Sequence, residues 1–208
     1  PVKLGHTAPP ASNSGAQALV LMAYGFLNKT GGLTAADVSS PQFEQWLREI
    51  ERGVPAFSDS TGDFMNDMVL AGPSKYDFGI VYENLALQSM DAARNRQGQP
   101  LRIYYPPATL LSDHPYATLQ APWATPEQRA AADKFRDFLL SRPIQELALQ
   151  SGFRPVDASV SIASSDPANP FNKYAQNGAL AGIPGQAETP SGATLRALLD
   201  LWRAKISR

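Results

Sequence analysis

Three short polar segments of this 208-residue chain carry side chains suited to binding a small molecule. They are "SNSG" at 12–15, "SDSTG" at 58–62 and "YEN" at 82–84, and an apolar segment follows each of them. This order predicts that each polar segment begins a helix. A helix start has backbone N–H groups without partners and a positive dipole end, so it favours an anion. The same residue types also form ordinary N-caps, which is the preferred interpretation for any single segment.

Together the segments supply more hydroxyl and amide groups than three caps require. We therefore expect nine ligand-binding residues: Ser12, Asn13, Ser14, Gly15, Ser60, Thr61, Gly62, Tyr82 and Glu83. The two glycines would let the backbone approach a ligand closely. His6 ends the first expected strand and could point into the same crevice.

Glu83 does not fit a simple anion site, because a carboxylate repels a divalent anion. Its preferred interpretation is a solvated residue in the first turn of a helix. If its side chain faces the ligand, an amine, a sugar hydroxyl or a metal becomes the expected ligand group.

Strands that alternate with helices are expected to hold these segments. Strands are predicted at 2–6, 78–82 and 101–105, and helices follow at 15–28 and from Glu83 to about residue 95. A further amphipathic helix begins at Ser40-Pro41. This alternation predicts an α/β fold with a largely parallel sheet.

The second half of the chain contains helices joined by a long irregular connection. A capping box at Thr125–Gln128 opens a helix to about residue 140, and a shorter helix covers 143–150. Residues 155–190 are rich in Pro, Gly, Ser, Asn and Ala, which indicates an irregular segment. The last helix is expected at 192–205.

Composition excludes several classes of function. Eighteen basic and 19 acidic side chains leave a net charge of −1, so no general attraction to nucleic acid is expected. The chain has no cysteine, and its longest apolar run, 18–24, is too short to span a bilayer. The chain has neither a G-x-S-x-G nor an H-E-x-x-H motif, so no catalytic residue, metal or cofactor is predicted.

At these residues the chain resembles a known family. The order "GHTAPPASNSG", "SDSTGDFMNDMVLAGPSKYDFGIVYEN", "RIYYPP" and "FRDFLLSRPIQELALQSGFRP" is similar to that of type II extracellular solute-binding proteins of bacterial ABC transporters. The resemblance is to the branch that binds molybdate, sulfate and phosphate. It implies two α/β lobes that close on a ligand, with the nine residues above in the second lobe. It also implies a ligand-contacting tyrosine at Tyr82.

The resemblance implies a division of the chain. Residues 1–106 would form the second lobe, and 107–208 would return to the first lobe with its C-terminal helices. The strand-helix half-lobe that begins such proteins is not matched, so residue 1 is expected to be a domain boundary. Apolar helix faces that the missing half-lobe would cover are then expected to bury themselves in a homodimer.

The function implied by the resemblance is non-enzymatic. The chain is expected to bind a small ligand, such as an oxyanion, and to deliver it to an ABC permease. Its expected location is periplasmic or extracellular, with membrane anchoring through a missing N-terminal segment. The alternative is an interaction or ligand-sensing module with the same fold, acting with a von Willebrand A-type domain protein.

Overall fold

The computed structural model describes residues 2–206 and divides the chain into two units. The first unit comprises residues 2–111 and 182–206, and the second unit comprises residues 112–181. The predicted boundary at 106 lies near the end of the first segment at residue 111. The C-terminal helix, predicted for the second part, belongs to the first unit. The assignment of either unit to a lobe stays a prediction.

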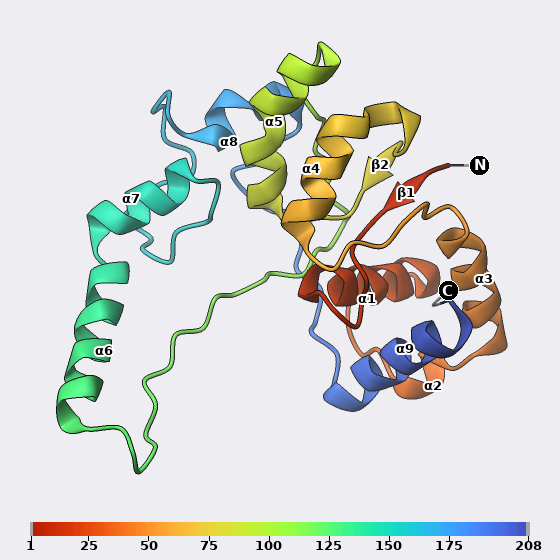
Figure 1. Cartoon of the computed structure of the whole chain (residues 1–208), viewed down its shortest axis with the longest axis horizontal. Coiled ribbons are helices and arrows are strands. Elements are labelled where there is room, and N and C mark those ends of the chain that lie inside the picture. Colours follow the sequence, from red (N-terminus) through yellow and green to blue (C-terminus); the bar gives the residue numbers. More distant parts are fainter. Residues whose placement is uncertain (1, 207–208) are drawn as a thin grey trace. The chain divides into compact units, whose positions relative to one another are not determined.

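A small parallel sheet forms the centre of the first unit (Figure 1). Strand β1 (Leu4–Gly5) pairs in parallel with β2 (Phe78–Gly79). On its other side the β1 segment bonds to residues 53–58, from Leu4 N to Gly53 O at 3.0 Å and from Ala8 N to Ser58 O at 2.8 Å. All three extended segments therefore run in the same direction. Parallel pairing of β1 and β2 agrees with the predicted parallel sheet, whereas no extended segment was predicted at 53–58.

Each extended segment leads into a helix. Helix α1 (Asn13–Leu27) follows β1, α4 (Thr61–Ala71) follows residues 53–58, and α5 (Glu83–Gln97) follows β2. Because the segments are parallel, the three helices begin at the same edge of the sheet. The strand predicted at 101–105 is wrong, since these residues form no strand. Leu101 instead packs against the α4 core.

Helix α1 is buried on several sides, and eight of its 15 residues are buried. Its contacts come from α3 (Pro41–Glu51) and α9 (Gly192–Lys205), and α9 also packs on α2 (Ala35–Val38). Figure 1 shows α1 close to α9. The centre of this core contains apolar side chains from α1, α3 and α9 without measurable exposure, namely Leu19, Phe43, Leu47 and Leu198.

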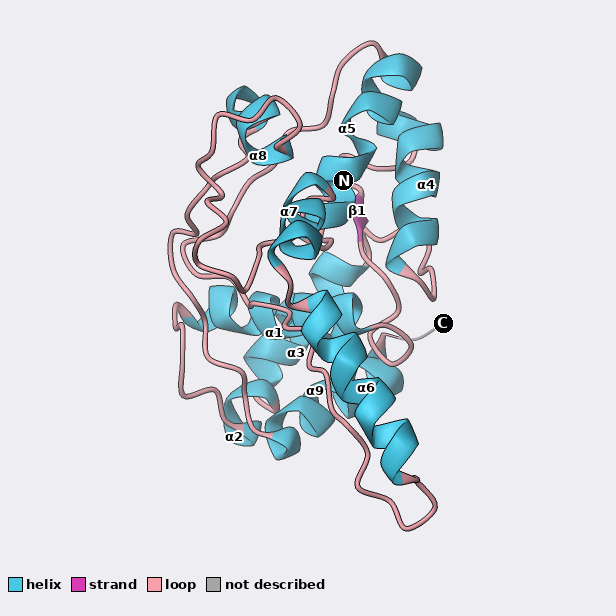
Figure 2. Cartoon of the chain, turned by 90° about the vertical axis from the view of Figure 1, so that its left-hand side faces the viewer, coloured by secondary structure: helices cyan, strands magenta, loops and turns pink. Residues whose placement is uncertain are grey.

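A second core cluster lies beneath α4. Helix α4 packs along α5, which Figure 2 shows side by side, and its Phe64 is fully buried. A Cβ atom on Gly5 would lie 2.4 Å from the Phe64 ring, and one on Gly79 would lie 2.7 Å away. The two strands therefore need glycine where Phe64 lies against the sheet.

The second unit contains α6 (Pro126–Leu139), α7 (Arg142–Gln150) and α8 (Pro170–Lys173), with long loops between α7 and α8 (Figure 2). The predicted capping box of Thr125 and Gln128 is confirmed. Residues 155–190 are mostly irregular, as predicted, apart from α8 and one 3₁₀ helix, Ala175–Asn177. Another 3₁₀ helix, Gly72–Ser74, lies in the first unit.

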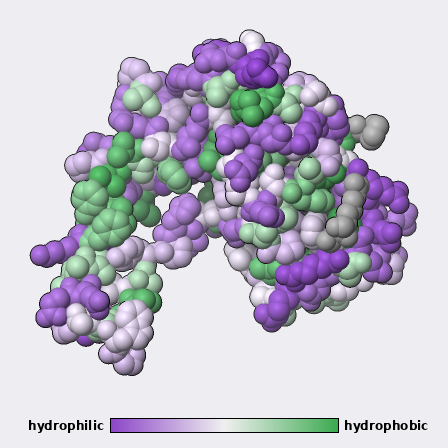
Figure 3. Space-filling model, in the orientation of Figure 1, coloured by the Kyte–Doolittle hydropathy of each residue, from purple (hydrophilic) through white to green (hydrophobic). Residues whose placement is uncertain are grey.

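Helix α6 has no buried residue. Figure 3 shows apolar side chains on the surface formed by α6 and α7, and the exposed ones there are Phe135, Phe138, Leu140 and Leu147. Burial of such a face in a second copy of the chain stays a prediction. No helix within residues 2–206 is long and apolar enough to cross a membrane.

Candidate functional site

Four hydroxyl groups meet at the edge of the sheet where the helices begin. Ser14 Oγ lies 2.8 Å from Thr7 Oγ1, 2.6 Å from Thr61 Oγ1 and 3.1 Å from Ser12 Oγ. Ser12 Oγ also lies 3.5 Å from Thr61 Oγ1. We call Thr7, Ser12, Ser14 and Thr61 the hydroxyl cluster. It joins the first turn of α1 to the first turn of α4.

The backbone around α1 explains why the cluster forms. Thr7 follows β1 and forms a parallel bridge with Ser58, which brings the two chain segments together. A Cβ atom on Gly15 would lie 2.3 Å from Thr7 O. Glycine at position 15 therefore lets α1 begin directly against the Thr7 backbone, which places Ser14 within hydrogen-bond distance of Thr7.

Two neighbouring residues at the start of α4, Ser60 and Thr61, have different roles. Ser60 Oγ accepts a hydrogen bond from Asp63 N at 3.1 Å and donates one to Asp63 Oδ2 at 2.8 Å. The Ser60 side chain is thus an N-cap, whereas the neighbouring Thr61 side chain joins the hydroxyl cluster. Gly62 has no side-chain or backbone atom closer than 3.9 Å to the place of a Cβ, so packing does not require glycine there.

The α5 start is connected to α1 by another side-chain contact. Asn13 Nδ2 donates to Tyr82 Oη at 3.0 Å. Glu83 accepts a hydrogen bond from the Tyr105 hydroxyl. The structure therefore brings Tyr82 next to the first turn of α1 and engages the Glu83 carboxylate with a hydroxyl group. Tyr82 itself makes no side-chain cap bond to α5.

The three helix starts differ in charge. The first turn of α1 has no acidic residue, and its cap residue Ser12 makes no side-chain cap bond. The first turn of α4 contains Asp63, and that of α5 contains Glu83. Of these three helices, α1 is therefore the one whose positive dipole end has no carboxylate in the first turn.

Exposure separates the predicted residues into two groups. Ser14 and Thr61 are buried, at 3% and 6% exposure, and Gly15 is buried with them. The others lie at or near the surface: Ser12, Asn13, Ser60, Gly62, Tyr82 and Glu83. The surface residues are the ones that a solute could contact without displacement of the buried hydroxyls.

His6 does not lie with the exposed residues. Its ring is fully buried, with Nε2 3.1 Å from Glu51 Oε2 and Nδ1 2.8 Å from Thr7 O. The expectation that His6 points into the crevice is wrong, because its two nitrogens are engaged inside the first unit. It supports the residue that begins the hydroxyl cluster.

Sequence reasoning missed two participants. Thr7 belongs to the cluster although no motif singles it out, and its position directly after a predicted strand was the available signal. The Tyr105 hydroxyl donates a hydrogen bond to Glu83, which lies 22 positions earlier in the chain. Only the tertiary structure brings these two residues together.

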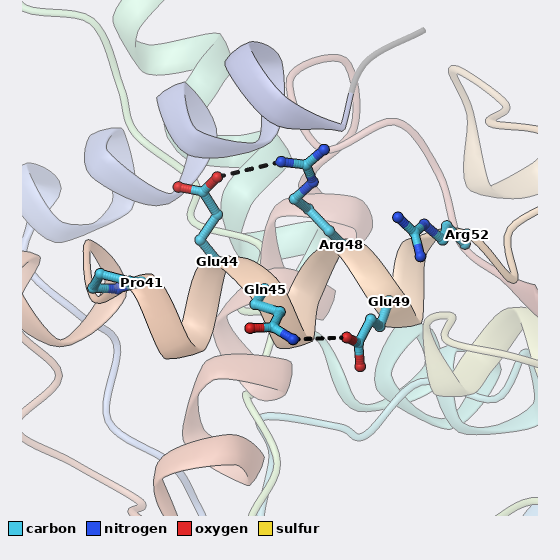
Figure 4. A pocket seen from close by; sticks show the side chains of 6 residues that line it. All are labelled: Pro41, Glu44, Gln45, Arg48, Glu49 and Arg52. Carbon is cyan, nitrogen blue, oxygen red and sulfur yellow. Dashed lines mark hydrogen bonds and ion pairs between the residues drawn. The ribbon is translucent and has the colours of Figure 1, made fainter.

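A separate hollow lies on α3 (Figure 4). Pro41, Glu44, Gln45, Arg48, Glu49 and Arg52 line it. Arg48 pairs with Glu44 at 3.6 Å, and Gln45 donates to Glu49 at 3.1 Å. The lining residues belong to α3, apart from Arg52 directly after it, and several pair with each other, which is typical of a solvated helix face. Within residues 2–206 no group of three or more His, Cys, Asp or Glu side chains is arranged to hold a metal ion.

Comparison with known proteins identifies the family. A family model described as bacterial extracellular solute-binding protein matches residues 2–154, which include the starts of α1, α4 and α5. No curated protein and no solved structure matches the chain. The resemblance found in the sequence is confirmed at this level: the chain belongs to the bacterial extracellular solute-binding protein family.

Proposed function

We propose that the first unit binds a small oxyanion at the hydroxyl cluster. The protein would act outside the cytoplasm and deliver the oxyanion, chemically unchanged, to an ABC permease in the membrane. One observation carries the proposal. Hydroxyls from two helix starts, Ser14 and Thr61, meet at the edge of parallel extended segments. Small solutes collect at this edge in open α/β sheets.

The start of α1 is the proposed anion contact. It is a helix of 15 residues whose first turn contains no acidic side chain. Its dipole contributes roughly half a positive charge at that end. A solute oxygen bound there would accept hydrogen bonds from backbone N–H groups and from the exposed amide of Asn13.

The weakest contact in the cluster supports rearrangement around a solute. Ser12 Oγ and Thr61 Oγ1 are 3.5 Å apart, longer than the usual 2.7–2.8 Å of an O–H···O hydrogen bond. The Ser12 side chain is partly exposed, so its hydroxyl can turn toward a solute oxygen and give up only this weak contact with Thr61. The bonds of Ser14 would remain and keep the cluster in place.

The neighbouring carboxylates favour an anion of low charge. Asp63 and Glu83 lie in the first turns of α4 and α5, where they accept hydrogen bonds from Ser60 and Tyr105. A divalent anion would meet stronger repulsion from them than a singly charged one. We therefore propose that singly charged oxyanions bind better than sulfate or molybdate.

Thermal stability with added solutes tests the proposal. The melting temperature would be compared with nitrate, acetate, phosphate, sulfate, molybdate, sugars and amino acids at constant ionic strength. A solute that binds the folded protein and not the unfolded chain raises the melting temperature, and the stabilisation grows with the logarithm of the solute concentration relative to its dissociation constant. Stabilisation by one class of oxyanion is expected, and stabilisation by sugars alone would contradict the anion assignment.

Two serine variants locate the site. Ser12→Ala is expected to weaken binding of the stabilising anion by about 5- to 30-fold, the effect of losing roughly 1–2 kcal/mol of hydrogen bonding to a charged group. Ser14→Ala removes the buried hydroxyl that contacts Thr7, Ser12 and Thr61, so it is expected to weaken binding through displacement of Ser12. Ser40→Ala is the matched control, because Ser40 caps α3 by accepting from Phe43 N. It should lower stability and leave affinity unchanged. Equal affinities for all three variants would place the solute elsewhere.

A further inference from the structure

A buried ionisable pair lies behind the hydroxyl cluster. His6 follows β1, and Glu51 is the last residue of α3. Their side chains have relative exposures of 0% and 1%, and His6 Nε2 lies 3.1 Å from Glu51 Oε2. Neither side chain contacts the proposed solute, so the site described above does not explain why two ionisable groups are buried here.

The contacts of the pair determine how many protons it holds. His6 Nδ1 lies 2.8 Å from the carbonyl oxygen of Thr7, which has no proton to give, so Nδ1 must donate. A second proton must lie between Nε2 and Glu51, because two lone pairs at 3.1 Å would repel each other. The pair is therefore either imidazolium with carboxylate or imidazole with carboxylic acid. Both forms hold one proton more than a neutral histidine beside an ionised glutamate.

Burial makes loss of that proton costly. Either protonated form has no net charge, whereas loss of the proton leaves one negative charge in the core. Within residues 2–206, Glu51 Oε1 is buried and has no hydrogen-bond partner that could stabilise such a charge. An unpaired buried charge is among the most unfavourable features of a folded protein.

The pair is connected to the cluster through Thr7. The Thr7 carbonyl accepts the His6 hydrogen bond and lies against Gly15 at the start of α1. The Thr7 hydroxyl lies 2.8 Å from Ser14 Oγ, which in turn lies 2.6 Å from Thr61 Oγ1. A displacement of His6 would therefore reach the first turns of α1 and α4 through consecutive contacts.

We propose that His6 and Glu51 are positioning residues that share one proton in the folded protein. This proton keeps the Thr7 carbonyl bonded to His6 and thereby keeps the side chains of the hydroxyl cluster in contact. Loss of the proton at alkaline pH releases the Thr7 carbonyl and loosens the cluster. The consequence for solute affinity rests on the proposed function, but the proton and its effect on the cluster do not.

Other charged groups near the pair along its elements have partners or are exposed. Lys3 beside β1 pairs with Asp77, Arg48 on α3 pairs with Glu44, and Arg52 is exposed. The ring of His6 also contacts Phe57, which contacts Trp202 of α9. The basic residues next to Trp202 pair with acids on the surface, Arg203 with Asp200 and Lys205 with Glu44.

The direction of the pH effect follows from the proton count. Wherever the folded protein holds one proton more than the unfolded chain, its stability falls as pH rises, by up to tenfold in the unfolding equilibrium constant for each pH unit.

Nuclear magnetic resonance of the isotope-labelled protein tests the shared proton directly. The chain has two histidines, and exposed His114 provides a reference in the same spectrum. At pH 7.5 we expect either both His6 nitrogens protonated beside ionised Glu51, or an Nδ1–H imidazole beside protonated Glu51. An ionised Glu51 next to a neutral His6 at that pH would overturn the proposal.

Glu51→Gln separates the shared proton from the packing of the side chain. The Gln amide can donate to Nε2 of a neutral His6, so the contact is retained without a shared proton. In the unmodified protein, the amide signals of Thr7, Ser14 and Thr61 are expected to shift together with His6 as pH rises. In the Glu51→Gln variant this response should disappear.

Glu44→Gln on the exposed face of the same helix is the control and should keep the pH response. A response in Glu51→Gln equal to that of the unmodified protein would contradict the proposal. If the Glu51→Gln variant does not fold, the measurement of the His6 and Glu51 protonation states in the unmodified protein still tests the proposal. None of these measurements needs a solute, so a failure to bind oxyanions would leave this result unaffected.

Discussion

The two units of the chain are stabilised in different ways. In the first unit, α1 contributes eight buried residues and lies among α3, α9 and the sheet. In the second unit, α6 contributes none, and buried polar side chains form hydrogen bonds with the backbone of long loops. Apolar burial is not directional, whereas hydrogen bonds fix particular groups. The cluster for which we propose solute binding lies in the unit with the larger apolar core, where the helix starts are held firmly.

The largest contrast is expected for removal of one aromatic ring. Phe43 is fully buried in the first unit, so Phe43→Ala should lower the free energy of unfolding by about 3–5 kcal/mol. Phe135 on α6 is 53% exposed, and Phe135→Ala should cost less than about 1 kcal/mol. Urea unfolding followed by hydrogen exchange in each unit measures both changes. Similar costs for the two variants would mean that α6 is buried in solution.

Glycine variants at two helix starts sharpen the comparison within the first unit. Gly15→Ala places a Cβ 2.3 Å from Thr7 O, and such overpacking should cost about 1–3 kcal/mol. Gly62→Ala meets no close atom and should be neutral or stabilising by up to about 1 kcal/mol. Thermal unfolding of the two variants is the measurement. A stable Gly15→Ala protein would show that α1 can move away from Thr7.

A single asparagine tests the polar contacts of the second unit. Asn169 is fully buried, donates to Ile162 O at 2.8 Å and accepts from Phe171 N at 3.1 Å. Asn169→Ala leaves these groups unpaired and should destabilise the loops around α8 by about 1–3 kcal/mol. Faster hydrogen exchange is expected in residues 155–180, with no change in the first unit. Faster exchange in α1 would mean that the two units do not unfold independently.

The smallest effect is expected from a partly exposed carboxylate on α4. Hydrogen bonds from Lys75 at 2.6 Å and from Tyr76 at 2.7 Å hold the pKa of Asp67 below its ordinary value. Its contribution is therefore present above about pH 4 and is lost as pH falls through the lowered pKa. Asp67→Asn should cost less than about 1 kcal/mol at pH 7, since the group is about one-third exposed and screened.

The pH dependence provides the check on this last prediction. The stability difference between Asp67→Asn and the unmodified protein should shrink as the pH falls below about 4. Asp157 is the counterpart in the second unit, because a hydrogen bond from Ser159 lowers its pKa. Asp157→Asn should leave unfolding of the first unit unchanged. A difference for Asp67→Asn that grows toward low pH would contradict the assigned cause.

The helices were predictable from sequence because their signals are local. Pro41 at the first turn of α3 and the capping box of Thr125 begin their helices at the predicted residues. The strands were harder, since β1 and β2 contain two residues each and exist through pairing between Leu4 and Phe78. The segment 101–105 has the composition of a strand but contributes to the α4 core without sheet pairing.

The sequence by itself determined where the polar segments lie and that each precedes a helix, because capping and turn chemistry act over a few residues. Only the tertiary structure decided which side chains meet. Thr7 reaches Ser14, Ser14 reaches Thr61 and Tyr105 reaches Glu83 through the parallel pairing and the packing of the helices. It also decided that His6 is buried against Glu51, 45 positions away. Contacts between distant residues depend on the packing of the whole unit, which no local pattern specifies.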